Sequence, residues 1–106
     1  MKGLDILAAH MVGDYILQTN EEAVGKTDSL VLLAKHVGKY TLAHAVVGVV
    51  HGRSLRRGIV YTLSVGAVHA ITDSRRWASG REWPPKPILV DQALHAVQLA
   101  ALGRLL

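Results

Sequence analysis

The sequence predicts an all-α protein, an antiparallel four-helix bundle in a single domain spanning residues 1–106. Apolar residues recur at three- and four-residue spacings over four long segments, which is typical of helices. Glycine, proline and polar residues separate these segments. Because the connections are short, neighbouring helices should run antiparallel. The strand-like stretches GVV and GIVYTLSV are too isolated to build a sheet.

The first predicted helix covers residues 3–19 and includes LAAHMVGDYILQ, which no proline interrupts. The polar stretch TNEEAVGKTDS comes next as a connection. Asp28 or Ser29 is the candidate N-cap of a second helix over 29–51, since both side chains can accept a backbone hydrogen bond. Gly52 is a suitable stop after it.

GRSLRRG forms a basic connection to a third predicted helix over 55–77. ASGREWPPKP is the clearest loop in the sequence. Pro87 suits the first turn of a fourth helix over 88–105, because proline has no amide hydrogen to leave unpaired there.

The composition limits the possible chemistry. There is no cysteine, which excludes disulfides and thiolate metal ligands. The formal charge of +4 and the pI near 9.8 favour an anionic partner, such as a phosphorylated small molecule or an acidic lipid, although a solubilising excess of basic residues fits equally well. No nucleic-acid-binding motif is present, so we do not expect a nucleic-acid partner.

Membrane insertion is left open by the sequence. Residues 30–51 are long enough to span a bilayer, but they include Lys35, Lys39 and three histidines, and charged groups are costly at that depth. Residues 59–72 contain no lysine, arginine, aspartate or glutamate, but they are too short to span a bilayer. Asp5 and His10 interrupt the first apolar stretch, so we expect no signal peptide and a cytoplasmic or membrane-associated protein.

Histidine and aspartate recur four residues apart inside apolar segments. Three of the five aspartates have such a partner, in the pairs His10 and Asp14, His69 and Asp73, and Asp91 and His95. On a helix this spacing places both side chains on one face.

Antiparallel helices would bring these pairs to one half of the bundle, where the second helix adds His36, with Tyr40 one turn later. Buried charges need a partner or a metal ion. The sequence therefore predicts either a metal site or a structural polar network. His44 and His51 fall toward the other half and should have no ligand role. The predicted metal ligands are His10, Asp14, His36, His69, Asp73, Asp91 and His95.

Five features follow one another along the chain: HMVGDYILQ, a lysine, HVGKYTL, HAITDSRR and DQALH. In this order they resemble the small helical family known as domain of unknown function 3307. The resemblance covers nearly the whole chain. It implies membrane association. The second predicted helix departs from that expectation, because it contains lysines, histidines and glycines. The residues that carry the resemblance are His10, Gly13, Asp14, Gln18, Lys26, His36, Tyr40, His69, Asp73, Arg76, Asp91, Gln92 and His95.

Imidazole and carboxylate ligands without sulfur suit a divalent transition metal such as Zn, Mn or Fe. Seven candidates could hold one or two ions. Two ions would suit phosphoester chemistry, so the leading hypothesis is a metal-dependent hydrolase acting on a phosphate-containing compound. The candidate catalytic carboxylates are Asp14, Asp73 and Asp91. The candidate substrate-binding residues are Lys26, Arg75, Arg76, Tyr40 and Gln18, with Arg81 and Lys86 at the same end.

Two other classes of function stay open. The protein could be a non-enzymatic binding or interaction protein in which a His/Asp network fixes the helix register. It could also be a small membrane protein whose polar residues line a path for an ion or solute. Homo-oligomerisation would suit thin helices with little polar surface.

Overall fold

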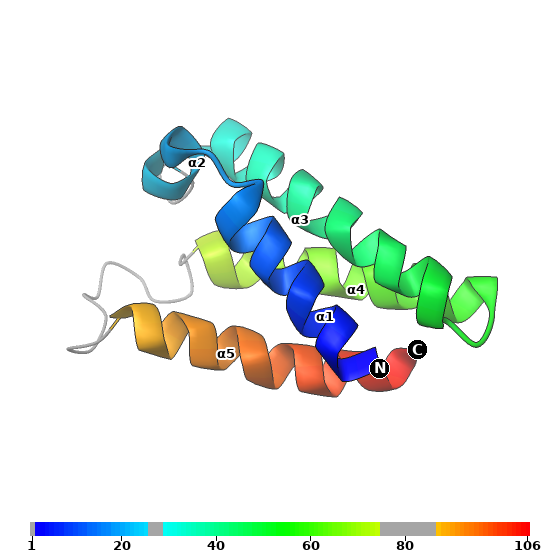
Figure 1. Ribbon diagram of the computed structural model, residues 1–106. Helices are drawn as coiled ribbons and strands as arrows, with labels where there is room; N and C mark the ends of the chain where they lie inside the picture. Colours follow the sequence, from blue (N-terminus) through cyan, green and yellow to red (C-terminus); the bar gives the residue numbers. More distant parts are fainter. Residues whose placement is uncertain (1, 26–28, 75–86) are drawn as a thin grey trace.

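The structure, a computed structural model, describes residues 2–25, 29–74 and 87–106 (Figure 1). Helices make up almost all of these residues, and no strand occurs among them, so the all-α prediction is confirmed. The packing is compatible with a bundle. The elements are α1 (Lys2–Met11), the π-helix η1 (Val12–Ile16), α2 (Asn20–Gly25), α3 (Leu30–His51), α4 (Leu55–Ser74), α5 (Pro87–Leu102) and the 3₁₀ turn η3 (Gly103–Leu105).

The two longest helices, α3 and α4, form a hairpin (Figure 1). Ser29 is the N-cap of α3, and its hydroxyl accepts a hydrogen bond from the Leu32 amide at 3.3 Å. The helix ends at Gly52, whose amide bonds the Gly48 carbonyl. Both signals were visible in the sequence because a cap and a stop depend on local chemistry.

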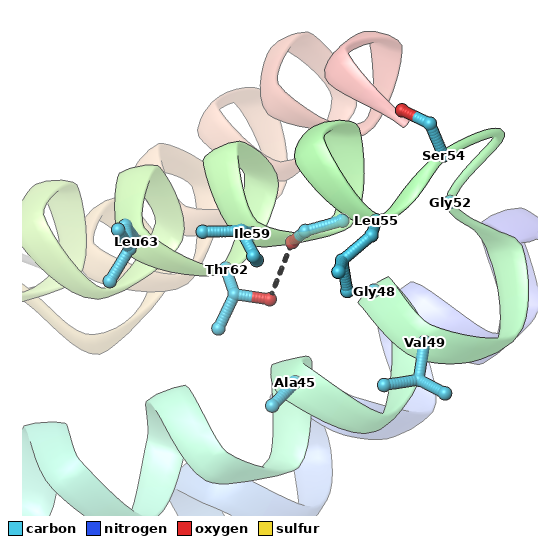
Figure 2. A pocket seen from close by; sticks show the side chains of 10 residues that line it. Ala45, Gly48, Val49, Gly52, Ser54, Leu55, Ile59, Thr62 and Leu63 are labelled. Atoms are coloured by element: carbon cyan, nitrogen blue, oxygen red, sulfur yellow. Dashed lines mark hydrogen bonds between the residues drawn. The ribbon is translucent and has the colours of Figure 1, made fainter.

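Glycines allow the backbones of α3 and α4 to touch near the turn. A Cβ atom on Gly58 would lie 2.5 Å from the Gly48 carbonyl oxygen, closer than any side chain tolerates. Figure 2 shows this region, where the Thr62 hydroxyl donates a 2.8 Å hydrogen bond to the Gly58 carbonyl. The close approach fixes how the two helices cross.

The first predicted helix, 3–19, differs from the helix in the structure. The α-helix ends at Met11, and the chain continues as the π-helix η1. There the Leu17 amide donates a 2.9 Å hydrogen bond to the carbonyl of Val12, five residues earlier. The connection predicted after it contains α2. Thr19 and Glu22 bond each other's backbone amides at its start, which is a capping box. The Thr-x-x-Glu pattern was a usable sequence signal for this helix.

The last two predicted helices match the observed elements within a few residues. The third was expected over 55–77; α4 covers Leu55–Ser74, and residues 75–77 lie outside the described residues. The fourth was expected over 88–105; α5 begins at Pro87, as its first-turn chemistry indicates, and η3 continues the chain to Leu105.

The interior contains an unusual share of polar groups. Among the described residues, as many polar or charged side chains as hydrophobic ones are buried, and histidine supplies five of them. No described helix has both the length and the apolar character that crossing a bilayer requires. The hydrophobic core joins every long helix through Ile6, Ala9, Tyr40, Val47, Tyr61, Val65, Leu99 and Leu106.

Candidate metal centre

Four buried side chains from η1, α3 and α4 meet inside the molecule. Asp14 comes from η1, His36 from α3, and His69 and Asp73 from successive turns of α4. One nitrogen or carboxylate oxygen from each lies within 4.8 Å of those of the other three. None of the four is more than 6% exposed.

The distances within this group are short. His36 Nε2 lies 2.8 Å from His69 Nε2 and 2.8 Å from an Asp73 carboxylate oxygen. The same Asp73 oxygen lies 3.0 Å from His69 Nε2. Asp14 Oδ1 lies 3.1 Å from His36 Nε2 and 3.4 Å from His69 Nε2.

These distances fit a tetrahedral ligand set. Nitrogen and oxygen ligands at about 2.0–2.2 Å from a Zn²⁺ ion would be separated by about 3.3–3.6 Å. Of the five separations in the structure, the 3.4 Å one reaches that spacing and the other four, 2.8 to 3.1 Å, are shorter. A small outward movement of the side chains would be enough to meet it.

Hydrogen bonding alone leaves this group incompletely satisfied. The facing Nε2 atoms of His36 and His69 can share only one proton when both rings are neutral. Asp14 Oδ1 is buried and makes no hydrogen bond. A buried acceptor without a donor is costly, and a cation would satisfy it.

The local fold explains how the carboxylate of η1 reaches α3. A Cβ atom on Gly13 would lie 2.6 Å from the Tyr40 ring, so glycine is needed for this approach. The Gln18 side chain donates a 3.1 Å hydrogen bond to the Asp14 carbonyl just after η1. Asp14 therefore points toward His36 and His69 and lies 3.7 Å from His10.

The surroundings favour charged carboxylates and a neutral imidazole on His69. Burial would raise the pKa of Asp73, but hydrogen bonds from His36 and His69 outweigh it and hold the pKa well below its ordinary value. The effect of burial on Asp14 is outweighed by the neighbouring imidazoles of His36 and His69, so its pKa is also lowered. Burial lowers the pKa of His69. These are the protonation states that bind metal.

A second set of side chains surrounds the four. His10 Nε2 donates to the Gln92 amide oxygen at 2.8 Å, and its Nδ1 accepts from the Tyr40 hydroxyl at 2.7 Å. His95 Nε2 lies 3.4 Å from Asp73 Oδ1. Both ring nitrogens of His10 are thus engaged by side chains of α3 and α5.

Tyr40 links this outer set to the centre. Its ring stacks on His69 with 3.6 Å between centroids and 8° between planes. The Tyr40 ring also lies 4.6 Å from the ring of His44, and a 2.7 Å hydrogen bond joins His44 Nδ1 and the Tyr61 hydroxyl. The rings form a column, which we call the ring column, made of His95, His69, Tyr40, His44 and Tyr61.

Six of the seven predicted metal ligands can be placed. The structure brings Asp14, His36, His69 and Asp73 into one group, while His10 and His95 lie beside it. The side chain of Asp91 lies outside the described part of the structure, so its predicted catalytic role stays a prediction. The assignment of ligand and catalytic roles to individual residues stays a prediction.

The predicted substrate-binding residues are placed less favourably. Tyr40 is 1% exposed, and its ring stacks on His69 inside the molecule. Gln18 is half-buried and bonds the backbone of η1. Lys26, Arg75, Arg76, Arg81 and Lys86 lie outside the described residues.

Sequence reasoning placed His44 and His51 away from the group, and neither belongs to it. His51 bonds Asp5 of α1 at 2.5 Å near the hairpin turn. His44, however, is fully buried in the ring column. Its partner Tyr61 lies 17 residues away on another helix, so nothing in the local sequence indicated this role.

A partly buried ion pair beside the centre was also missed. The Glu22 carboxylate of α2 lies 2.8 Å from Lys39 Nζ of α3, and Lys39 also donates to the Leu17 carbonyl. The hydrogen bond from Lys39 lowers the pKa of Glu22. This pair joins α2 and the end of η1 to α3, one turn from His36.

Comparison with known protein families gives a match over residues 4–105, nearly the whole chain, to the family described as Protein of unknown function (DUF3307). The chain belongs to the DUF3307 family. The resemblance carried by the ordered motifs is therefore confirmed. The searches of curated proteins and of solved structures gave no significant match. The centre described above is thus a candidate site within a DUF3307 protein whose description assigns no chemistry.

Proposed function

We propose that this DUF3307 protein binds one divalent transition-metal ion through Asp14, His36, His69 and Asp73. The observation that carries the proposal is the meeting of four buried side chains of ligand type, with an Asp14 oxygen among them that makes no hydrogen bond. Two imidazoles and two carboxylates suit Zn, Mn or Fe. His10, His95 and Asp91 would then lie outside the ligand set, or help to hold a second ion.

The test is metal content, measured on protein purified without a histidine tag. We expect about one ion per chain by elemental analysis. After chelation, Co²⁺ should restore an absorption spectrum typical of tetrahedral coordination. Asp73→Asn keeps the size of the side chain but removes its charge, and should weaken Co²⁺ binding by at least 10–100-fold.

Asp5→Asn is the matched control, because Asp5 is an exposed carboxylate bonded to a histidine outside the group. It should bind Co²⁺ as the wild type does. Wild-type protein that stays free of metal and takes up no Zn²⁺, Mn²⁺, Fe²⁺ or Co²⁺ would overturn the proposal.

We further propose a use for the ion, the hydrolysis of a phosphate-containing compound. A divalent ion supplies Lewis acidity and an activated water to such reactions. The support on the protein side is His10 and His95, two imidazoles next to the ligands that could accept or donate a proton. The net charge of +4 favours an anionic substrate.

Metal-loaded protein should then hydrolyse a nitrophenyl phosphate monoester or diester, and the Asp73→Asn variant should not. Restoration of the rate by added metal after chelation would tie the activity to the ion. The absence of turnover by fully loaded protein, with every substrate in the panel, would contradict the hydrolase proposal while leaving metal binding intact.

A structural role is the second candidate, and the burial of the site favours it. Four protein ligands complete a tetrahedron, as in structural zinc sites, whereas catalytic sites usually keep one position open. The protein would then be a non-enzymatic binding or interaction protein whose α1, α3, α4 and α5 form an antiparallel four-helix bundle. Loaded protein that is more stable but catalytically inert supports this candidate.

A further inference from the structure

The α3–α4 hairpin carries an exposed apolar groove at its turn (Figure 2). Its volume is about 470 Å³, and its floor is formed where Gly48 and Gly58 bring the two helices together. Four large side chains border it and remain exposed: Val49 by 82%, Leu55 by 79%, Leu63 by 65% and Ile59 by 49%. We call these four the hairpin patch.

Apolar exposure on this scale is unusual for a protein surrounded by water. Eighteen large hydrophobic side chains are exposed among the described residues, and eleven of them belong to α3 and α4. Monomeric soluble proteins rarely leave large contiguous apolar patches uncovered, and such patches mark sites of interaction.

Between residues 29 and 72, the charges on the hairpin all have one sign. Residues 29–72 contain no aspartate or glutamate, but they contain five lysines and arginines. Arg53, Arg56 and Arg57 lie in and just after the turn, directly beside the groove-lining segment, and all three are exposed. The acidic side chain that contacts this end is Asp5, which bonds His51 and does not line the groove.

The combination of these features selects one partner. A second copy would bring two positively charged turns together if the same face were shared. Nucleic acid would not use aliphatic side chains. An anionic bilayer surface accepts both groups, because aliphatic side chains enter the headgroup–acyl boundary while arginines meet the lipid phosphates. We infer that the hairpin patch and its three arginines dock this protein on the surface of an anionic membrane.

The test is flotation of the whole chain with vesicles of neutral phosphatidylcholine, or of phosphatidylcholine with about 30% phosphatidylglycerol. Binding should be strong only with the anionic vesicles and should weaken between about 0.1 and 0.5 M NaCl, because salt screens the arginines. Arg56→Gln and Arg57→Gln should each weaken it about fivefold. Val49→Ser should weaken it by about tenfold.

Two variants serve as controls. Val97→Ser removes another exposed valine, from α5, and Lys35→Gln removes an exposed cation from the other half of α3. Neither should alter vesicle binding by more than about twofold. Since all five changes are at exposed positions, unchanged melting temperatures will show that the fold is retained.

Equal binding to both kinds of vesicle, or no binding, would overturn the inference. So would a concentration-dependent dimer that Leu55→Ser dissociates, because the patch would then be an interface between copies of the chain. Metal content does not enter the experiment, so its outcome is independent of the proposed function.

Discussion

At the scale of single residues, Tyr40 has the most informative surroundings. One side chain connects His10, through its hydroxyl, with His69, through its ring. A stacked ring restricts how the buried imidazole of His69 can rotate, and the χ angles of His69 set where its Nε2 points. In the proposed metal site, Tyr40 would therefore act as a positioning residue, and its ring and hydroxyl can be tested separately.

Replacing Tyr40 by Phe or by Leu separates the two contributions. Tyr40→Phe keeps the ring against His69 and removes only the bond to His10, so Co²⁺ affinity should fall by less than about tenfold. Tyr40→Leu removes the ring and should cost about 10–100-fold, with a changed Co²⁺ spectrum. Titration with Co²⁺ followed by absorption measures both. Equal losses in the two variants would show that stacking on His69 does not matter.

His44 leads to a prediction about pH. Burial lowers the pKa of His44 from 6.5 to about 3. Below pH 6.5 the unfolded chain binds a proton that the folded chain excludes, so folding loses stability as the pH falls toward 3. The loss is up to about 1.4 kcal/mol for each pH unit. The His44→Gln variant has no imidazole at this position, so it does not undergo this loss of stability.

Urea unfolding of wild type and His44→Gln between about pH 7.5 and pH 4.5 tests this prediction. The charges of His10, His69 and Asp14 also act on His44, but they are present in both proteins. Tyr61, bonded to His44, stays neutral throughout, because burial raises its pKa. We expect the free-energy difference between the two proteins to shrink below pH 6.5. A difference that does not vary with pH would contradict the burial argument.

At the scale of elements, local signals explain what the sequence could predict. The start and end of α3 result from Ser29 and Gly52, and the proximity of His69 and Asp73 results from one helix turn. The capping box of α2 is a local signal of the same kind. The π-helix could not be foreseen, because the spacing of His10 and Asp14 also fits an ordinary α-helix.

The candidate site was predictable to a similar degree. Pairs on one helix were found from spacing, and His36 was found from antiparallel packing. Contacts that depend on the crossing of two helices were not, such as Tyr61 with His44 or Lys39 with Glu22. Their geometry is set by tertiary packing that no local pattern encodes.

The crossing of α3 and α4 can be tested with two glycine substitutions of opposite expected sign. In Gly58→Ala the new Cβ would meet the Gly48 carbonyl at 2.5 Å, so the hairpin must shift at a cost of about 1–3 kcal/mol. Gly38→Ala is the control in α3, where nothing lies within 4 Å. It should stabilise the protein by up to about 1 kcal/mol through helix propensity.

Thermal or urea unfolding will measure both changes. A destabilised Gly38→Ala would mean that this exposed face of α3 is covered by another molecule in solution. A neutral Gly58→Ala would mean that the helices can separate near the turn without loss.

At the scale of the whole molecule, the candidate centre joins segments that are far apart in the sequence. A ligand that binds only the folded chain stabilises it by about 2.7 kcal/mol when present at about 100 times its dissociation constant. For a domain of this size, that corresponds to a rise of about 10–20 °C in melting temperature.

Differential scanning calorimetry with and without Zn²⁺ or Co²⁺ should detect this rise in the wild type, and a chelator should reverse it. The Asp14→Asn variant should show little or none of it. If metal leaves the melting temperature of the wild type unchanged, the His/Asp group is a structural network without an ion.

The π-helix makes the centre sensitive to the length of the chain as well as to its composition. A turn closed five residues apart accommodates one residue more than an α-helical turn, so deleting Val12 would let the helix close in the ordinary way. His10 and Asp14 would then be three residues apart instead of four, in a helix where each residue contributes about 100° of rotation and about 1.5 Å of rise. Their side chains would no longer be aligned although every proposed ligand is retained, so this one-codon deletion should weaken metal binding about as much as losing a proposed ligand.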